Sequence, residues 1–467
     1  MSNRARPRLI ADKKGLSATP IRALTPATLP AWRDRHAGEA AAWVETNRFK
    51  AASGEILLMP DKAGGCESVL LGLGNAPDPL ALAALPPRLP EGHYRLAEDA
   101  PPEIAAHAAT AWALGCYRFT AYRSSPPRDD WPQLVVAPDT DIPRTLRLVD
   151  AVGKARDLIN TPAADMNPAA LEAEMRTLAD ASGATLEVIT GDDLLKANYP
   201  MLHAVGRAAD VPPRLLDLRW GDEDSPRITL VGKGVCFDTG GLNLKPGDSM
   251  ELMKKDMGGA AVAIALAGAL MEAGLPVRLR VLVGAVENAI GAGAFRPGDV
   301  LPSRKGLNVE IGNTDAEGRL ILADMLAEAD SESPDLIVDL ATLTGAARVA
   351  LGPDLAPFYT RDDALAAALA AEAHAAADPM WRMPLWSPYA DWLDSAIADV
   401  NHIARPAGQA GSIVAALFLA RFVDCPRWVH CDIYGWTIHA RSGRPVGGEA
   451  HALRALYGLL ETRYGKA

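Results

Sequence analysis

Apolar runs typical of buried strands alternate with helical stretches, most clearly in the second half of the chain. Residues 227–234 (RITLVGKG), 277–288 and 335–345 carry the continuous apolar runs of strands that are covered on both faces. Residues 258–274 and 319–330 have the length and spacing of helices. Strands that alternate with helices in this way predict a mostly parallel sheet flanked by helices, an α/β fold.

The first part of the chain has a shorter version of the same pattern. Residues 68–76 (SVLLGLGNA) predict a buried strand that runs into glycines, and residues 102–119 predict a helix. The G-x-G at the end of this strand lacks the third glycine and the acidic partner of a dinucleotide site, so a tight turn is the favoured interpretation. We therefore expect a smaller α/β domain at the N-terminus.

Proline-rich and turn-rich segments separate the two parts. Residues 124–133 (SSPPRDDWPQ) and 137–143 (APDTDIP) have the composition of loops, and a helical pattern begins at residue 144. These signals place a domain boundary near residue 140. They predict a smaller domain over residues 1–140 and a larger one over residues 141–467.

Composition narrows the class of protein. With 467 residues, of which 49% are hydrophobic and 22% charged, the chain can bury a large core. Its first residues have no apolar leader, and the longest apolar run, residues 258–271, is too short to cross a bilayer. The five cysteines are scattered without a C-x-x-C pair, which fits buried thiols in a reducing compartment better than disulfides. A cytoplasmic protein without membrane association is expected.

Charge is divided unevenly between the two parts. Residues 1–140 hold 16 Lys and Arg against 15 Asp and Glu, which leaves 31 against 43 for residues 141–467. The acidity of the larger part disfavours a general polyanion-binding surface there and suits a site that collects cations. The nearly balanced charge of the smaller part does not exclude a local basic patch there.

Charged residues follow two of the predicted strands, at the sheet edge where parallel sheets place their ligand sites. They are Lys233, Asp238, Lys245 and Asp256 after the first strand, and Asp315, Glu317 and Arg319 after a short strand at residues 307–312. Asp315 and Glu317 are two positions apart, so in extended backbone they would project to the same side. The sequence therefore brings four carboxylates to one edge.

Four converging carboxylates repel one another, and a pair of divalent cations is the simplest neutraliser. Oxygen ligands without histidine suit Mn²⁺ or Mg²⁺ and, less typically, Zn²⁺. In the alternative interpretation each carboxylate only caps a helix and each lysine is a solvated surface charge. Spacing alone does not decide between the two.

Three of these segments resemble the signature segments of the leucyl aminopeptidase family, the two-metal cytosolic aminopeptidases also called peptidase family M17. They are VGKGVCFDTGGLNLKP (231–246), MKKDMGGAA (253–261) and NTDAEGRL (313–320). The similarity continues through ARDLINTPAADMNP, ATLTGAARVALG, GSIVAALFLARFV and WVHCDIYG to the C-terminus, and it is weaker over the first 140 residues. The resemblance implies a metal-dependent hydrolase that removes N-terminal residues from peptides.

The resemblance also assigns metal ligands. Lys233 and Asp256 would complete the tighter of two metal sites, and Asp315 would belong to the more exchangeable one. Asp238 would contact both metals, and Glu317 would bridge them. The implied cofactors are two divalent ions per subunit, Mn²⁺ or Zn²⁺ with Mg²⁺ as a further option.

Two further residues would act beside the metals. Lys245 would be the electrophile that meets the developing oxyanion, and Arg319 would hold a bicarbonate that acts as general base. A ligating lysine must be neutral, so Lys233 would need a lowered pKa. The nine histidines, His402 and His430 among them, are then expected to be structural or surface groups.

A pocket for the side chain of the substrate's first residue is implied by the same comparison. Its lining would be Met253, Thr342, Gly345, Tyr434 and Thr437. Relatives commonly carry a small residue where this chain has Tyr434, so the ring would narrow the pocket, unless it turns into the core. The segment NAIGAGAFRPGD (288–299) also departs from the family pattern and is expected to touch no ligand.

Two other functions remain as alternatives. One is a DNA-binding or architectural role on the same fold, against which the acidic balance and the absence of a basic tract count. The other is an inactive scaffold, against which the complete set of implied metal and catalytic positions counts. Peptides with a free N-terminus are the expected partners, and the family resemblance implies a homohexamer.

Overall fold

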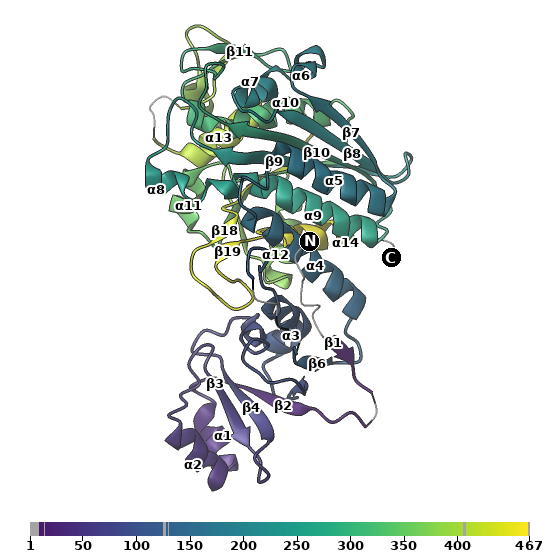
Figure 1. The fold of residues 1–467 in the computed structure, drawn as a ribbon, viewed down its shortest axis with the longest axis vertical. Helices are drawn as coiled ribbons and strands as arrows, with labels where there is room; N and C mark the ends of the chain where they lie inside the picture. Colours follow the sequence, from purple (N-terminus) through teal and green to yellow (C-terminus); the bar gives the residue numbers. More distant parts are fainter. Residues whose placement is uncertain (1–8, 14, 125–127, 129, 405–407, 466–467) are drawn as a thin grey trace. The chain divides into compact units, whose positions relative to one another are not determined.

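The structure is a computed structural model that describes residues 9–13, 15–124, 128, 130–404 and 408–465. The chain folds as two compact units (Figure 1). The N-terminal unit comprises residues 1–153 together with 439–446, and the C-terminal unit comprises residues 154–438 and 447–467. The division falls within helix α4 (Ile142–Asn160). The domain boundary near residue 140 stays a prediction.

A six-stranded sheet forms the centre of the N-terminal unit. In spatial order its strands are β1 (Leu9–Ala11), β6 (Gln133–Val136), β5 (His93–Leu96), β2 (Thr19–Leu24), β4 (Cys66–Gly72) and β3 (Ile56–Pro60). Neighbouring strands are parallel except for β3 and β4. The helical elements are α1 (Leu29–Arg35), α2 (Glu39–Thr46), the 3₁₀ turn η1 (Ala81–Ala84) and α3 (Pro102–Gly115). The smaller α/β domain predicted from the sequence is confirmed.

Glycines at the end of β4 allow close backbone contact. A Cβ added to Gly72 would lie 2.1 Å from the carbonyl oxygen of Ala52, and Gly74 has a φ of +68°. No hydrogen-bonded turn is described at residues 72–74, and the next element along the chain is the 3₁₀ turn η1 and not an α-helix, so the expectation of a tight turn at the G-x-G was wrong. The loop predicted at residues 124–133 falls partly on 125–127 and 129, which lie outside the described residues.

The C-terminal unit is built on an eight-stranded sheet. In spatial order its strands are β15 (Met380–Arg382), β14 (Ala356–Tyr359), β17 (Trp428–Asp432), β13 (Leu336–Ala341), β9 (Arg227–Asp238), β10 (Arg278–Asn288), β8 (Arg214–Trp220) and β7 (Thr185–Thr190). The central strands β17, β13, β9 and β10 are parallel, and antiparallel strands flank them. The predicted mostly parallel sheet is confirmed at its centre.

Helices cover both faces of this sheet (Figure 1). One face carries α5 (Pro168–Ser182), α9 (Gly258–Glu272) and, packed on α9, α14 (Leu453–Tyr464). The other carries α7 (Pro200–Gly206), α10 (Gly318–Asp330) and, packed on α10, α13 (Gly411–Leu419). The remaining helical elements are α6 (Asp193–Lys196), α8 (Gly247–Met250), η2 (Met253–Met257), η3 (Thr314–Ala316), α11 (Gly345–Leu351), α12 (Asp363–Ala375) and η4 (Ser387–Leu393).

Small residues bring α9 close to the sheet. A Cβ added to Gly259 would lie 2.0 Å from the carbonyl oxygen of Leu340 in β13, and one added to Gly232 in β9 would lie 2.6 Å from the Cα of Ala260. Residues with larger side chains would push the helix away at these contacts. This approach places the start of α9, and with it Asp256, against β9.

Two short sheets complete the unit. One is formed by β11 (Val300–Pro302), β12 (Asn308–Glu310) and β16 (Val400–Asn401), and the other by β18 (Trp436–Thr437) and β19 (Gly447–Gly448). All five cysteines are free thiols, and all except the half-buried Cys66 are buried, which agrees with the expected absence of a disulfide framework. In the described part of the chain, no helix is both long enough and apolar enough to cross a bilayer.

Candidate metal centre

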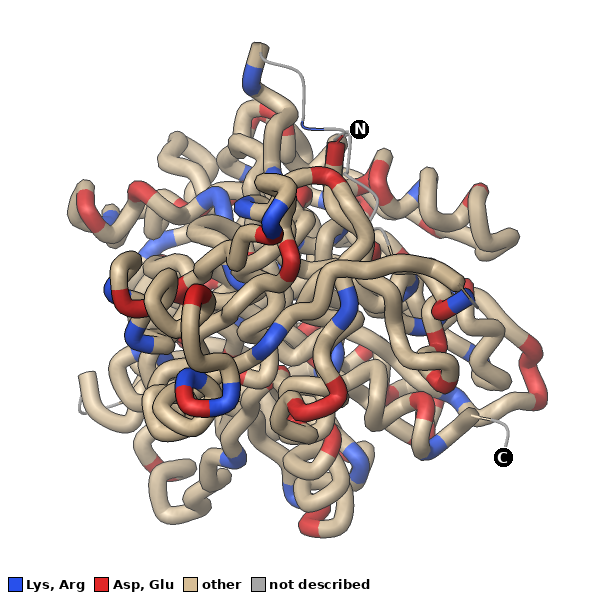
Figure 2. Tube along the Cα trace, turned by 90° about the horizontal axis from the view of Figure 1, so that it is seen from below, with Lys and Arg blue, Asp and Glu red and all other residues tan. Residues whose placement is uncertain are grey.

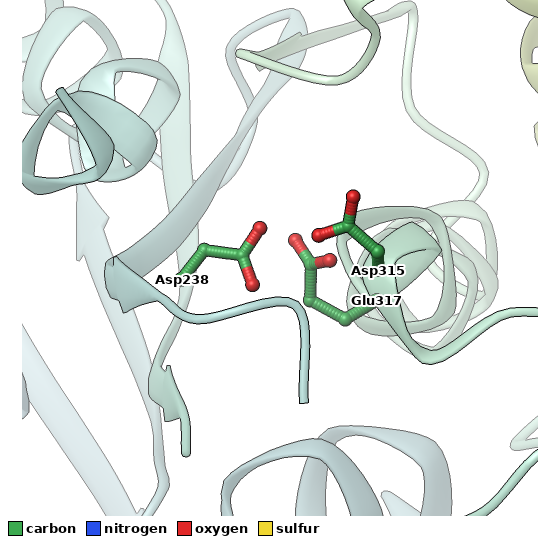
Figure 3. A group of neighbouring side chains, drawn as sticks. All are labelled: Asp238, Asp315 and Glu317. Atoms are coloured by element: carbon green, nitrogen blue, oxygen red, sulfur yellow. The ribbon is translucent and has the colours of Figure 1, made fainter. Parts of the chain in front are cut away.

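Three carboxylates meet at the carboxyl end of β9. Asp238 is the last residue of β9, whereas Asp315 lies in the 3₁₀ turn η3 and Glu317 directly precedes α10. Each can offer an oxygen such that all three oxygens lie within 4.8 Å of one another. Figure 3 shows the three carboxyl groups pointing toward a common space. Oxygens at this spacing suit a hard divalent cation.

Two lysines bridge these carboxylates and Asp256. Lys233 Nζ lies 2.6 Å from Asp256 Oδ2 and 2.9 Å from Glu317 Oε1. Lys245 Nζ lies 2.8 Å from Asp238 Oδ2 and also contacts Asp315. The structure thus brings all five predicted metal ligands into one cluster with Lys245.

The backbone between Asp315 and Glu317 is not extended, and the expectation that it would be was wrong. Thr314–Ala316 forms a 3₁₀ turn, and Glu317 has helical angles of φ −68° and ψ −34°. The side chain of Asn313 accepts a hydrogen bond from the Asp315 N–H at 2.9 Å and so favours a turn. The two carboxylates converge because the chain coils, not because it alternates.

Glycines make room for these contacts. A Cβ added to Gly318 would lie 2.5 Å from Lys233 Cε, so a larger residue between Glu317 and Arg319 would displace the lysine. Gly240 has a φ of +88°, and a Cβ there would lie 2.9 Å from Asp315 Oδ1. Gly318 is therefore required for space, and Gly240 for both backbone shape and space.

Burial makes the cluster costly to ionise. Burial, together with the neighbouring Asp238, raises the pKa of Asp315 to about 6 and that of Glu317 to about 8. Burial opposes the charge of Lys233 too, but Asp256, Glu317 and Asp238 outweigh it and raise its pKa. A cation bound nearby would stabilise the charged form of these carboxyl groups and lower their pKa.

Buried atoms without partners indicate where further ligands fit. Glu317 Oε2 accepts no hydrogen bond from the described residues, although it is buried. Buried Arg319 Nε likewise has no acceptor within the described part of the chain, while Arg319 Nη1 donates to the His402 carbonyl oxygen at 2.7 Å. Burial lowers the pKa of Arg319 to about 10, so it stays charged at neutral pH. The donor set fits a divalent cation at Glu317 and an oxyanion at Arg319.

Family models match both parts of the chain. The model described as "Cytosol aminopeptidase family, catalytic domain" matches residues 154–457, and the model described as "M17 aminopeptidase, N-terminal domain" matches residues 19–135. The chain belongs to the cytosol aminopeptidase family. Membership makes it an aminopeptidase and therefore a hydrolase, as predicted from its signature segments.

Relatives of this M17 chain span most of its length. A probable cytosol aminopeptidase of Roseiflexus castenholzii is 38% identical over 377 residues, 77% of each chain, and one of Chlorobaculum tepidum is 35% identical over 88% of this chain and 90% of its own. The crystal structure of the Coxiella burnetii cytosol aminopeptidase has 43% identity and a TM-score of 0.90, covering 98% of this chain and 99% of its own. The bottromycin maturation enzyme BotP in complex with Mn has 33% identity and a TM-score of 0.84, covering 96% of this chain and 100% of its own.

Of the predicted pocket residues, Thr342 contacts the carboxylate cluster directly and Met253 lies in the same turn as Asp256. Thr342 Oγ1 donates to Asp256 Oδ1 at 2.7 Å, and Met253 begins the turn η2 that carries Asp256. Gly345 is exposed at the start of α11, and Thr437 Oγ1 donates to Glu449 Oε2 at 3.4 Å. Their role in substrate binding stays a prediction.

Tyr434 is half-buried, which does not fit the alternative that it turns into the core. The Lys255 ammonium lies 4.7 Å from the centroid of its ring, and the Arg348 guanidinium carbon lies 5.3 Å from it. Arg348 Nη1 also donates to the Tyr434 hydroxyl at 3.3 Å. Two cations therefore hold the ring in place.

Asn288 corrects the expectation that the segment at residues 288–299 touches no ligand. Its Nδ2 donates to Asp238 Oδ1 at 2.7 Å and to the Thr314 carbonyl oxygen at 3.1 Å. It is buried at the end of β10, next to the end of β9. Asn288 thus orients one carboxylate of the cluster and holds the turn that carries Asp315.

His402 is a second positioning residue that the sequence did not reveal. The Gly312 N–H donates to His402 Nδ1 at 3.1 Å, so the Nε2–H donates to the Asn313 carbonyl oxygen at 2.8 Å. Burial and Arg319 lower the pKa of His402 to about 3, which keeps the ring neutral. The histidine is structural, as expected, but it fixes the segment that leads into η3.

We expect Asn288→Leu to weaken metal binding by about 10 to 100-fold, the usual effect of losing a group that orients a ligand. The change keeps the side chain's approximate volume but removes both donors to the Asp238 carboxylate and to the Thr314 carbonyl. The measurement is the Mn²⁺ concentration that gives half-maximal activity. Asn308→Leu, at an exposed position in β12, is the control. Equal metal affinity in both variants would refute the positioning role.

Proposed function

We propose that this chain is a two-metal aminopeptidase that acts on peptides with a free N-terminus. The observation that carries the proposal is the convergence of Asp238, Asp315 and Glu317 on one space, with Lys233 and Asp256 beside them. Two bound divalent ions would supply a water of lowered pKa, a Lewis acid for the carbonyl oxygen and a ligand site for the amine. The five named side chains would hold these ions.

Lys233 has a demanding role in this proposal. Its contacts with Asp256 and Glu317 favour the ammonium form, whereas a metal ligand must offer a free lone pair. The lysine would therefore have to release its proton as the metal binds. Its Nζ also donates to the Thr342 carbonyl oxygen at 3.0 Å, which helps to keep the nitrogen at the cluster.

Lys245 and Arg319 would act on the reacting groups. Lys245 contacts the carboxylates of Asp238 and Asp315. At this position its positive charge could stabilise an oxyanion. Arg319 would anchor bicarbonate with the Nε that has no acceptor within the described part of the chain. The planar guanidinium of Arg319 matches a planar oxyanion, and a bicarbonate held there would supply a general base.

Substrates that differ only at the amine test the proposal. A leucyl chromogenic amide should be hydrolysed with added Mn²⁺, whereas the N-acetylated amide should not, because acetylation removes the amine that a metal would bind. Equal hydrolysis of both substrates would show that the free N-terminus is not recognised. No hydrolysis of any aminoacyl amide by metal-loaded protein would favour an inactive scaffold.

We propose Mn²⁺ or Zn²⁺ as the native ions, a homohexamer as the assembly and the cytoplasm as the location, all in keeping with the family. The DNA-binding alternative gains no support from the charge distribution. In the view of Figure 2, positions of Lys and Arg lie among positions of Asp and Glu along the trace. The formal net charge of −11 also disfavours a general polyanion surface.

We expect Tyr434→Ala to raise kcat/KM for leucyl and phenylalanyl substrates relative to alanyl ones. The ring would narrow the pocket where relatives carry a small residue, and a misfit of one methylene changes kcat/KM by about 10 to 200-fold. A panel of aminoacyl amides measures the ratio, with Tyr122→Ala at an exposed tyrosine as the control. An unchanged ratio in folded, metal-loaded Tyr434→Ala would place the ring outside the pocket.

A further inference from the structure

Two cations beside the metal centre have no counter-ion in the described part of the chain. The first is Lys255, which directly precedes Asp256 in the turn η2 and is 5% exposed. Its Nζ has no hydrogen-bond acceptor and no ion pair among the described residues, and it lies 4.7 Å from the centroid of the Tyr434 ring. Because Nζ has no acceptor and is still not fully enclosed, it faces open space. A buried amino group in this state suits an incoming acceptor.

The second cation is Arg348 on α11, whose side chain is exposed. Its Nη1 donates to the Tyr434 hydroxyl at 3.3 Å, and no carboxylate of the described residues pairs with the guanidinium. An arginine side chain is always charged and carries several N–H donors, so most of them stay available to a ligand. The contact with the phenol restrains the side chain and lowers the entropy cost of binding.

The carboxylates close to Lys255 are already engaged. They are Asp256 and Asp432, which act on the charge of Lys255 without pairing with it. Asp256 Oδ1 accepts a hydrogen bond from Thr342 Oγ1 at 2.7 Å, and its Oδ2 lies 2.6 Å from Lys233 Nζ. Asp432 accepts hydrogen bonds from two backbone N–H groups and two hydroxyl groups. The acidic groups of the chain therefore leave Lys255 able to bind another anion.

The ring of Tyr434, which contacts both cations, lies at the border of the metal centre. Gly435, the next residue, has a φ of +70°, and a Cβ there would lie 3.0 Å from Thr342 Cγ2. Thr342 in turn donates to Asp256, the sequence neighbour of Lys255. An amine bound at the metal centre is attached to the Cα of the first residue of a peptide. The side chain on that Cα would therefore lie close to this border.

We propose that Lys255 and Arg348 select peptides whose first residue is aspartate or glutamate. This inference rests on the proposed aminopeptidase function, since it takes the free amine to bind the metal centre. A carboxylate on the first side chain would accept charge-assisted hydrogen bonds from both groups, which are stronger than hydrogen bonds between neutral groups. An apolar first side chain would leave the Lys255 amino group without an acceptor, and a basic one would meet like charge.

Pairs of substrates with the same shape and different charge test the proposal. Glutamyl and glutaminyl chromogenic amides differ mainly in a carboxylate against an amide, and so do the aspartyl and asparaginyl amides. With full-length, metal-loaded protein at saturating Mn²⁺, we expect kcat/KM for the glutamyl amide to exceed that for the glutaminyl amide by about 10-fold or more. These amides have no C-terminal carboxylate, so the ratio reports the first side chain alone.

Variants of the two cations locate the selection. Arg348→Met and Lys255→Met should each lower the glutamyl-to-glutaminyl ratio by about fivefold or more, because each removes N–H donors and keeps an unbranched side chain. Arg348→Lys keeps a cation and should retain part of the preference. Arg176→Met removes an exposed arginine paired with Glu172 on α5, and as the control it should leave the ratio unchanged. Metal content and thermal melting check each variant, and Arg348→Met decides the test if Lys255→Met disturbs Asp256.

The outcomes separate this inference from the proposed function. Protein that hydrolyses a leucyl amide but shows equal kcat/KM for the glutamyl and glutaminyl amides would overturn the inference and leave the aminopeptidase function standing. A ratio that stays unchanged in both cation variants, or falls equally in Arg176→Met, would also overturn it. So would a preference for free dipeptides over their C-terminal amides without a glutamyl preference, because the cations would then bind the other end of the substrate. No hydrolysis of any aminoacyl amide would overturn both proposals.

Discussion

Chelation of the divalent ions should lower aminopeptidase activity by at least about 10³-fold, because the attacking water and the carbonyl would both lose their activation. The protein should nevertheless stay folded. Lys233 contacts Asp256 and Glu317, and Lys245 contacts Asp238 and Asp315, so two ammonium groups offset part of the carboxylate charge without a metal. Activity should therefore return when Mn²⁺ is added back.

Elemental analysis and activity before and after chelation measure this expectation. Glu317→Gln should give a similar loss, since it keeps the shape of the side chain but removes the charge of the proposed bridging ligand. Glu251→Gln, at an exposed position near the site in sequence, is the matched control. Chelated protein that keeps full activity and contains no divalent ion would exclude the metal mechanism.

Replacement of Lys245 by Ala should lower kcat by about 10² to 10³-fold while both metals remain bound, the usual effect of losing an oxyanion donor. The contacts of Lys245 suggest a competing role, because its Nζ lies 2.8 Å from Asp238 Oδ2 and also contacts Asp315, two of the proposed metal ligands. If its main task were to hold these carboxylates together, metal affinity would fall first.

The two roles of Lys245 separate in the measurements. A transition-state role predicts a lower kcat at saturating Mn²⁺ with unchanged metal content, whereas a holding role predicts activity that recovers at high Mn²⁺. Lys305→Ala, which removes a lysine paired with Asp424 on the surface, is the control for general effects. Recovery of Lys245→Ala to wild-type kcat would contradict the assigned role.

The main elements of the C-terminal unit could be predicted because burial on both faces leaves a direct mark on the sequence. β9, β10 and β13 are continuous apolar runs, and α9 is apolar all round since it is covered by the sheet and by α14. The signature segments then located the charged residues at the ends of these elements.

The local conformation and the supporting residues of the site could not be predicted in the same way. The 3₁₀ turn at Thr314–Ala316 depends on side chain to backbone hydrogen bonds, which leave no periodic pattern. Asn288 lies 50 positions from Asp238, and His402 lies 89 positions from Asn313. Nothing in the local sequence pattern shows that such distant residues contact the carboxylates or the turn that carries them, because the contact arises only when the chain is folded.

The segment at residues 439–446 makes the N-terminal unit discontinuous in sequence, with consequences for exchanging parts between relatives. A fragment that starts at Lys154 would retain this segment but lose Leu80 and Leu114, against which Gly443 lies. A chimera that imports residues 1–153 from another member would likewise join a foreign surface to the native segment. A chimera should therefore take residues 439–446 from the same relative as residues 1–153. The two segments are separate in the sequence but fold as one unit.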